Sequence, residues 1–138
     1  MNDNEDINND AGNHWSLMVY GKNTNKFYHY DSIGRSNEKH ARKVITFLTK
    51  ANKCFKDEME AKNATQQSDG HSCGVFTIMH ASKIAVNIVN KSNSEEVYEI
   101  GIGSKDNIAK TRNWINEIIT NLITRMVGQK NLRCFSTR

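Results

Sequence analysis

The sequence lacks the features of membrane and secreted proteins. Its 138 residues contain no apolar run of about 18 residues, the length that a membrane-spanning helix needs. The first residues, MNDNEDINNDAGN, have neither the basic start nor the apolar stretch of a signal peptide. Only three cysteines occur, and no Cys-x-x-Cys pair, so neither a disulfide framework nor a structural zinc site is indicated. We therefore expect an intracellular protein, cytoplasmic or nuclear.

Blocks of basic residues and prolines are also missing. The net charge is +4, but the Lys and Arg residues are scattered and never form a run of five or six. This distribution favours a solvated surface, so we expect no nucleic-acid partner. Proline is absent, and Asn, Lys and Ile are abundant. This composition indicates an AT-rich genome rather than a requirement of the fold. Hydrophobic residues make up 37% of the chain, which is enough for one core.

The first predicted element is a β-hairpin that follows a polar lead over residues 1–13. Residues 14–20 (HWSLMVY) are apolar and β-prone, and residues 27–31 (FYHYD) are aromatic-rich with strand character. A polar segment, Gly-Lys-Asn-Thr-Asn-Lys, separates them. The pattern predicts two paired strands joined by a turn.

Three helices and a short strand are predicted after the hairpin. Ser36 or Asn37 can cap a first helix with apolar residues at helical spacing, and a short strand is predicted within residues 59–65. Residues 73–89 (CGVFTIMHASKIAVNIV) are apolar almost all round, which is typical of a buried central helix. A last, amphipathic helix is predicted over residues 107–127.

Cys73 is the residue with the most specific chemical environment. At the start of a helix, the helix dipole and unpaired backbone N–H groups stabilise a thiolate and lower the thiol pKa. The alternative is a small core cysteine, which is the commoner role of this residue type. A cysteine nucleophile also needs a base and a group that orients the base.

His14 and Asp31 can supply these two groups. His14 opens the first predicted strand and Asp31 closes the second, so antiparallel pairing brings their side chains to the same end of the sheet. If the helix of Cys73 begins at that edge, His14 can take the thiol proton while Asp31 fixes the imidazole tautomer. Gln67 can direct its amide at an oxyanion. The ordinary alternatives are a strand-end histidine, a turn aspartate and a solvated glutamine.

A metal site is not expected. The candidate ligands are His71, Cys73 and His80, but Cys73 and His80 would lie about 10.5 Å apart along one helix, too far to share an ion. We interpret His29, His40 and His80 as surface or packing histidines. No cofactor is expected.

Three segments carry a resemblance to a known family. They are HWSL from His14, YDS around Asp31 and QSDGHSCG from Gln67 to the residue after Cys73. In this order and context they resemble the Ulp/sentrin-specific cysteine proteases, which cleave ubiquitin-like modifiers after their C-terminal diglycine. The segments HWSLMVY and FYHYDSIGRSN, the glutamine pair before the turn and Arg112-Asn-Trp114 are most similar to the deneddylase branch.

The resemblance implies a role for each matching residue. His14 would be the base, Asp31 its partner, Cys73 the nucleophile and Gln67 the oxyanion-hole residue. Trp15 matches the tryptophan that covers the tunnel for the diglycine tail. The implied partners are a ubiquitin-like modifier (Nedd-type, SUMO or ubiquitin) and its conjugates, with the Nedd type favoured. Ser72 departs from the family, which usually has an acidic residue before its cysteine.

The resemblance also implies a fold and an organisation of the chain. The expected fold is α+β: a papain-like core of the Ulp type, with a short mixed sheet packed against a central helix that bears the cysteine. The family's domain begins well upstream of its histidine, so we expect the C-terminal catalytic part of such a protease, incomplete at its N-terminal side. The expected divisions are a lead over residues 1–13, a catalytic region over residues 14–128 and a tail over residues 129–138.

Three other functions compete with a thiol isopeptidase. A non-catalytic remnant would bind a modifier or partner without turnover. A cysteine-dependent acetyltransferase would use a related His, acid and Cys arrangement, but the HWSL and YDS contexts argue against it. Nucleic-acid binding is disfavoured because the basic residues form no patch.

Overall fold

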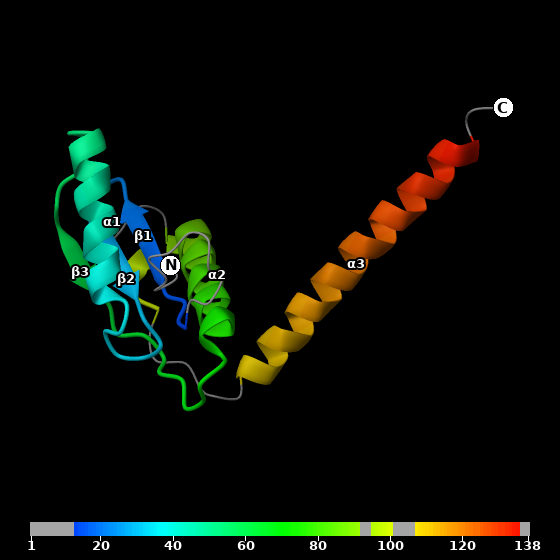
Figure 1. Cartoon of the computed structure of the whole chain (residues 1–138), viewed down its shortest axis with the longest axis horizontal. Coiled ribbons are helices and arrows are strands. Elements are labelled where there is room, and N and C mark those ends of the chain that lie inside the picture. The colour runs from blue at the N-terminus through cyan, green and yellow to red at the C-terminus, as the bar shows by residue number, and fades with distance from the viewer. Residues whose placement is uncertain (1–12, 92–94, 101–106, 136–138) are drawn as a thin grey trace. The chain divides into compact units, whose positions relative to one another are not determined.

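The computed structural model describes residues 13–91, 95–100 and 107–135 (Figure 1). The chain divides into two compact units, Met1–Lys105 and Asp106–Arg138. The elements of the first unit run, in chain order, as β1 (Leu17–Gly21), β2 (Lys26–Tyr30), α1 (Glu38–Ala51), β3 (Met59–Ala61), α2 (Cys73–Lys91) and the 3₁₀ helix η1 (Glu95–Tyr98).

The sheet of the first unit is small and mixed, as the family resemblance implies. Its strand order is β1-β2-β3, with β1 antiparallel and β3 parallel to β2. Leu17 pairs with Tyr30, so the residues just before β1 and just after β2 meet at one end of the sheet. This register confirms the predicted hairpin, and it is the feature that positions the candidate site.

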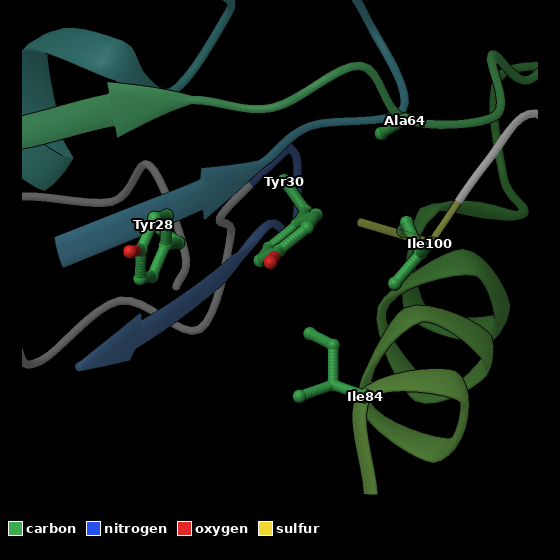
Figure 2. Close-up of a cluster of buried hydrophobic side chains, with 5 residues drawn as sticks. All are labelled: Tyr28, Tyr30, Ala64, Ile84 and Ile100. Carbon is green, nitrogen blue, oxygen red and sulfur yellow. The ribbon is translucent and has the colours of Figure 1, made fainter. Parts of the chain in front are cut away.

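Alternation along β2 gives the sheet a face that packs against α2. Tyr28 and Tyr30 are fully buried and form one cluster with Ile84 of α2, Ala64 and Ile100 (Figure 2). Tyr30 also donates a hydrogen bond from its hydroxyl to the carbonyl oxygen of Tyr98, at 2.8 Å. A mixed sheet packed against the helix that bears the cysteine is the predicted α+β core, and this prediction is confirmed.

The prediction of a helix buried all round is wrong, most clearly for the second half of α2. Phe76, Met79 and Ile84 are buried, but Val86 and Val89 are 57% and 80% exposed. β1 and η1 pack against one side of α2. An apolar composition does not indicate which side of a helix is covered by other elements. The start of α2 at Cys73 agrees with the prediction.

One strand start differs from the predicted one, and one predicted helix cap makes no capping hydrogen bond. β1 begins at Leu17, so His14 precedes the strand rather than opening it. α1 has Asn37 at its N-cap position, as predicted, but the Asn37 side chain makes no capping hydrogen bond to the helix.

The second unit contains α3 (Asn107–Phe135). The helix runs past residue 127, its predicted end, and into residues 129–138, where we expected a tail. Described apolar side chains of α3 are exposed, among them Trp114, Ile118 and Leu122, because a single helix has no core of its own. Among the residues that the structure describes, no helix is both long and apolar enough to cross a membrane.

Candidate active site

His14 and Asp31 form a buried pair at the end of the hairpin. His14 Nε2 lies 2.6 Å from Asp31 Oδ1, and the two residues are only 3% and 4% exposed. His14 lies three residues before β1 and Asp31 directly follows β2, so the strand pairing brings together side chains that are 17 positions apart. The proximity predicted from the sequence is therefore present in the structure.

The Asp31 carboxylate accepts hydrogen bonds from its own loop as well as from His14. The backbone N–H of Ile33 donates to Oδ1 at 2.8 Å, and that of Asn37 donates to Oδ2 at 2.9 Å. An ionised carboxylate only accepts, so Nε2 of His14 carries the proton in the bond to Asp31. In a neutral imidazole this tautomer leaves the basic lone pair on Nδ1.

Cys73 is the first residue of α2 and is 7% exposed. The turn before it is held by Asp69, whose carboxylate accepts from the Ser72 N–H, the Ser72 hydroxyl and the His71 N–H at 2.7 to 2.9 Å. The hydrogen bond from the Ser72 side chain is the main reason that the pKa of Asp69 falls to about 2. Asp69 thus supplies a carboxylate to the turn in which Ser72 replaces the family's acidic residue. The space beside Gly74 is open, since an added Cβ there would meet no atom within 4 Å.

Gln67 connects the Asp31 loop to the Cys73 turn. Its Oε1 accepts from the Ser32 hydroxyl at 2.7 Å, and its backbone N–H donates to the Ser32 carbonyl oxygen at 2.9 Å. Its Nε2 donates to the carbonyl oxygen of Asp69 at 2.6 Å. These bonds fix both ends of the amide, and the second N–H of the –NH₂ group remains as a donor beyond the bond to Asp69.

Trp15 and the ring of His80 lie outside this network, whereas His71 joins it through its backbone N–H to Asp69. Trp15 follows His14 and is 49% exposed. His71 is mostly exposed, whereas His80 is buried with its ring 6.1 Å from those of Tyr30 and Phe76. Burial lowers the pKa of His80 to about 4, so it packs as a neutral ring near neutral pH. Within the described ranges, no three His, Cys, Asp or Glu residues group as possible metal ligands.

Four residues that hold the site were not predicted to take part in it: Ser32, Asn37, Gln66 and Asp69. Gln66 accepts from the Gly34 N–H at 2.6 Å and donates to the Asp31 carbonyl oxygen at 2.9 Å. The Asp69-Gly70 pair is a turn signal, and an aspartate there commonly accepts from the N–H groups that follow it. Gln66 and Asn37 carry no comparable local signal, because their partners are 32 and 23 positions away.

Comparison with known proteins places the chain in a family. A model described as the Ulp1 protease family, C-terminal catalytic domain, matches residues 6–126. The match covers most of the chain, which therefore belongs to the Ulp1 protease family.

Individual relatives agree with this assignment. Sentrin-specific protease 8 of Rattus norvegicus is 34% identical over 83 residues, which is 59% of this chain and 38% of the relative. NEDD8-specific protease 1 of Arabidopsis thaliana is 29% identical over 136 residues, which is 94% of this chain and 58% of the relative. The similarity to the deneddylase branch is thus confirmed, and the chain matches only about two fifths to three fifths of the length of these relatives.

Proposed function

We propose that this chain carries the catalytic site of a thiol peptidase that cleaves after the C-terminal diglycine of a ubiquitin-like modifier, with a Nedd-type modifier favoured. The observation that carries the proposal is the buried His14–Asp31 pair, 2.6 Å apart at the end of the hairpin. The family match and the names of the relatives, which specify sentrin and NEDD8, support the substrate class.

The proposed reaction proceeds through a thioester. The Cys73 sulfur attacks the carbonyl carbon of the terminal glycine after His14 has taken the thiol proton, and the Gln67 amide and the Cys73 N–H stabilise the oxyanion. The C–N bond then breaks as His14 returns the proton to the leaving amine. A water molecule, deprotonated by His14, attacks the thioester carbonyl carbon, and the C–S bond breaks as the sulfur takes the proton back from His14. The modifier leaves as a carboxylate, and its carboxyl proton passes to solvent.

A panel of electrophilic modifiers tests the proposal. Nedd-type, SUMO and ubiquitin proteins, each ending in a propargyl amide after diglycine, would be incubated with the chain and the products measured by intact mass. We expect one covalent adduct, fastest with the Nedd-type probe, and none after denaturation. Binding of a modifier without adduct formation would instead indicate a non-catalytic binding protein.

Removal of the Gln67 amide should slow turnover without removing the nucleophile. Gln67→Ala is expected to lower kcat by about 10² to 10³, the effect of losing one oxyanion donor, because the Cys73 N–H remains. Ser32→Ala removes only the hydroxyl that orients Gln67 Oε1, so its effect should be smaller. The measurement is steady-state cleavage of a modifier–aminocoumarin substrate.

Ser68→Ala is the control for Gln67, since Ser68 is the exposed next residue. It should cleave like the parent. A Gln67→Ala variant with the parent kcat would remove Gln67 from the proposed oxyanion hole.

Truncation of Trp15 should weaken catalysis far more than stability. About half of the Trp15 residue is already exposed, so Trp15→Ala loses about half the buried surface that truncation of a core tryptophan would lose. If the indole covers the extended diglycine tail, its loss lets the scissile carbonyl shift, and a shift of about 1 Å costs about 100-fold in rate. The assays are kcat/KM on the Gly-Gly-linked substrate and thermal unfolding.

Phe47→Ala is the control, because Phe47 is an aromatic residue that is 71% exposed near the C-terminal end of α1, away from the Asn37 end that contacts the His14–Asp31 pair. It should leave kcat/KM unchanged. If Trp15→Ala unfolds at a much lower temperature while its folded fraction cleaves normally, Trp15 is a packing residue and not the tunnel cover.

A further inference from the structure

The buried residue Asn37 contacts both members of the His14–Asp31 pair. Its backbone N–H donates to Asp31 Oδ2 at 2.9 Å, and its side-chain Nδ2 donates to the carbonyl oxygen of His14 at 3.2 Å. Asn37 is 0% exposed, so both bonds are shielded from water. One residue therefore connects the backbone of the histidine to the carboxylate that binds its ring.

Helix capping does not account for the Asn37 side chain. Asparagine is favoured at N-caps because its side-chain oxygen accepts from N–H groups of the first helical turn. Asn37 occupies the N-cap position of α1, yet its side chain makes no capping hydrogen bond to α1. The amide donates instead to a residue 23 positions earlier, outside the helix.

The location of His14 gives this bond its importance. His14 precedes β1, so its backbone lies beyond the regular pairing of β1 with β2. The bond from Asn37 fixes the carbonyl oxygen of His14 relative to the loop that also holds Asp31. Movement of this backbone would shift the imidazole, and a shift of about 1 Å at a catalytic group costs about 100-fold in rate.

We propose that Asn37 is a positioning residue that sets the His14 backbone and imidazole for proton transfer. The inference rests on the proposed function, in which His14 is the base. Asn37 acts through His14 and does not touch the substrate. Its loss should therefore lower kcat and leave KM unchanged.

The test compares Asn37→Ala with Asn37→Ser. Both variants keep the backbone N–H to Asp31, but neither side chain can reach the His14 carbonyl oxygen as a donor. Serine is a preferred N-cap residue, so Asn37→Ser maintains the start of α1. We expect kcat to fall by about 10- to 100-fold in both variants, with KM unchanged and the Ser variant melting close to the parent. Arg42→Ala, which removes an exposed ion pair with Glu38 in the same helix, is the control and should keep the parent kcat.

A second measurement does not depend on turnover. In protein labelled with ¹⁵N-histidine, the His14 Nε2–H resonance and ring ¹⁵N shifts report the bond to Asp31, with His14→Gln used for assignment. We expect both to change in Asn37→Ser and to stay unchanged in Arg42→Ala. A parent chain that reacts with no modifier would refute the proposed function, while the spectra would still decide the role of Asn37. A Ser variant with the spectrum of the parent, or with its kcat where the parent cleaves, would overturn that role.

Discussion

Alanine in place of Cys73 is expected to abolish modifier cleavage. The proposed reaction has no first step without the thiol, and deleting the nucleophile of a comparable catalytic triad lowers kcat by about 10⁶. Cys73 is buried at the first residue of α2, in a turn that Asp69 fixes through Ser72 and His71. The Cys73→Ala variant keeps all of these hydrogen bonds, so its fold should remain and the loss should appear in kcat alone. Modifier cleavage and adduct formation with the propargyl probe both measure it.

The other two cysteines provide the controls for Cys73. Only Cys73 begins a helix directly after the turn that Gln67 joins to the Asp31 loop, so Cys54→Ala and Cys134→Ala should cleave the substrate at the parent rate. Cys73→Ala should also still bind the modifier, because it removes a single sulfur atom from the site. Full cleavage by Cys73→Ala, or a probe adduct mapped to Cys54 or Cys134, would contradict the assignment of the nucleophile.

The hairpin and the His14–Asp31 pair were predictable because strand pairing follows from local patterns. Two β-prone segments separated by a polar turn pair antiparallel, and the ends of such a pair coincide whatever the rest of the fold does. The register Leu17 to Tyr30 therefore brings residues before β1 and after β2 together. The start of α2 was predictable for a similar reason, since a turn-like segment precedes an apolar run that begins at Cys73.

The residues that hold the site in place were not predictable from local patterns. Asn37 looks like a helix cap in the sequence, and only the tertiary structure turns its amide towards His14. Gln66 has the pattern of a polar loop residue, and Gln67 was predicted only to direct its amide at an oxyanion, yet both bind the loop that follows Asp31. Such hydrogen bonds form only where two loops that are far apart in the sequence lie side by side in the fold. Sequence spacing does not show which loops will do so. For the same reason, the composition of α2 failed to predict which half of the helix is exposed.

Asp31→Asn is expected to lower kcat by about 10⁴, which is less than the loss expected on removal of the nucleophile. The substitution keeps the shape of the side chain but replaces one carboxylate oxygen with an –NH₂ group. If that group faces His14, it donates to Nε2 and favours the tautomer with the proton on Nδ1. Nδ1, which carries the basic lone pair in the parent, then cannot take the thiol proton. The lost anion also removes the stabilisation of the imidazolium that forms during attack. Single-turnover cleavage with excess enzyme measures the chemical step directly.

Asp31→Ala separates this catalytic effect from the structural one. The alanine variant leaves the buried N–H groups of Ile33 and Asn37 without their carboxylate acceptor, at about 1 to 3 kcal/mol for each unsatisfied group, so it should unfold at a lower temperature than Asp31→Asn. The asparagine variant retains one acceptor oxygen and should lose less stability while losing a similar factor in kcat. If unfolding alone caused the loss of activity, kcat would fall in proportion to the folded fraction in both variants. An Asp31→Asn protein that is folded and cleaves at the parent rate would show that His14 works without an anionic partner, and the triad would be wrong.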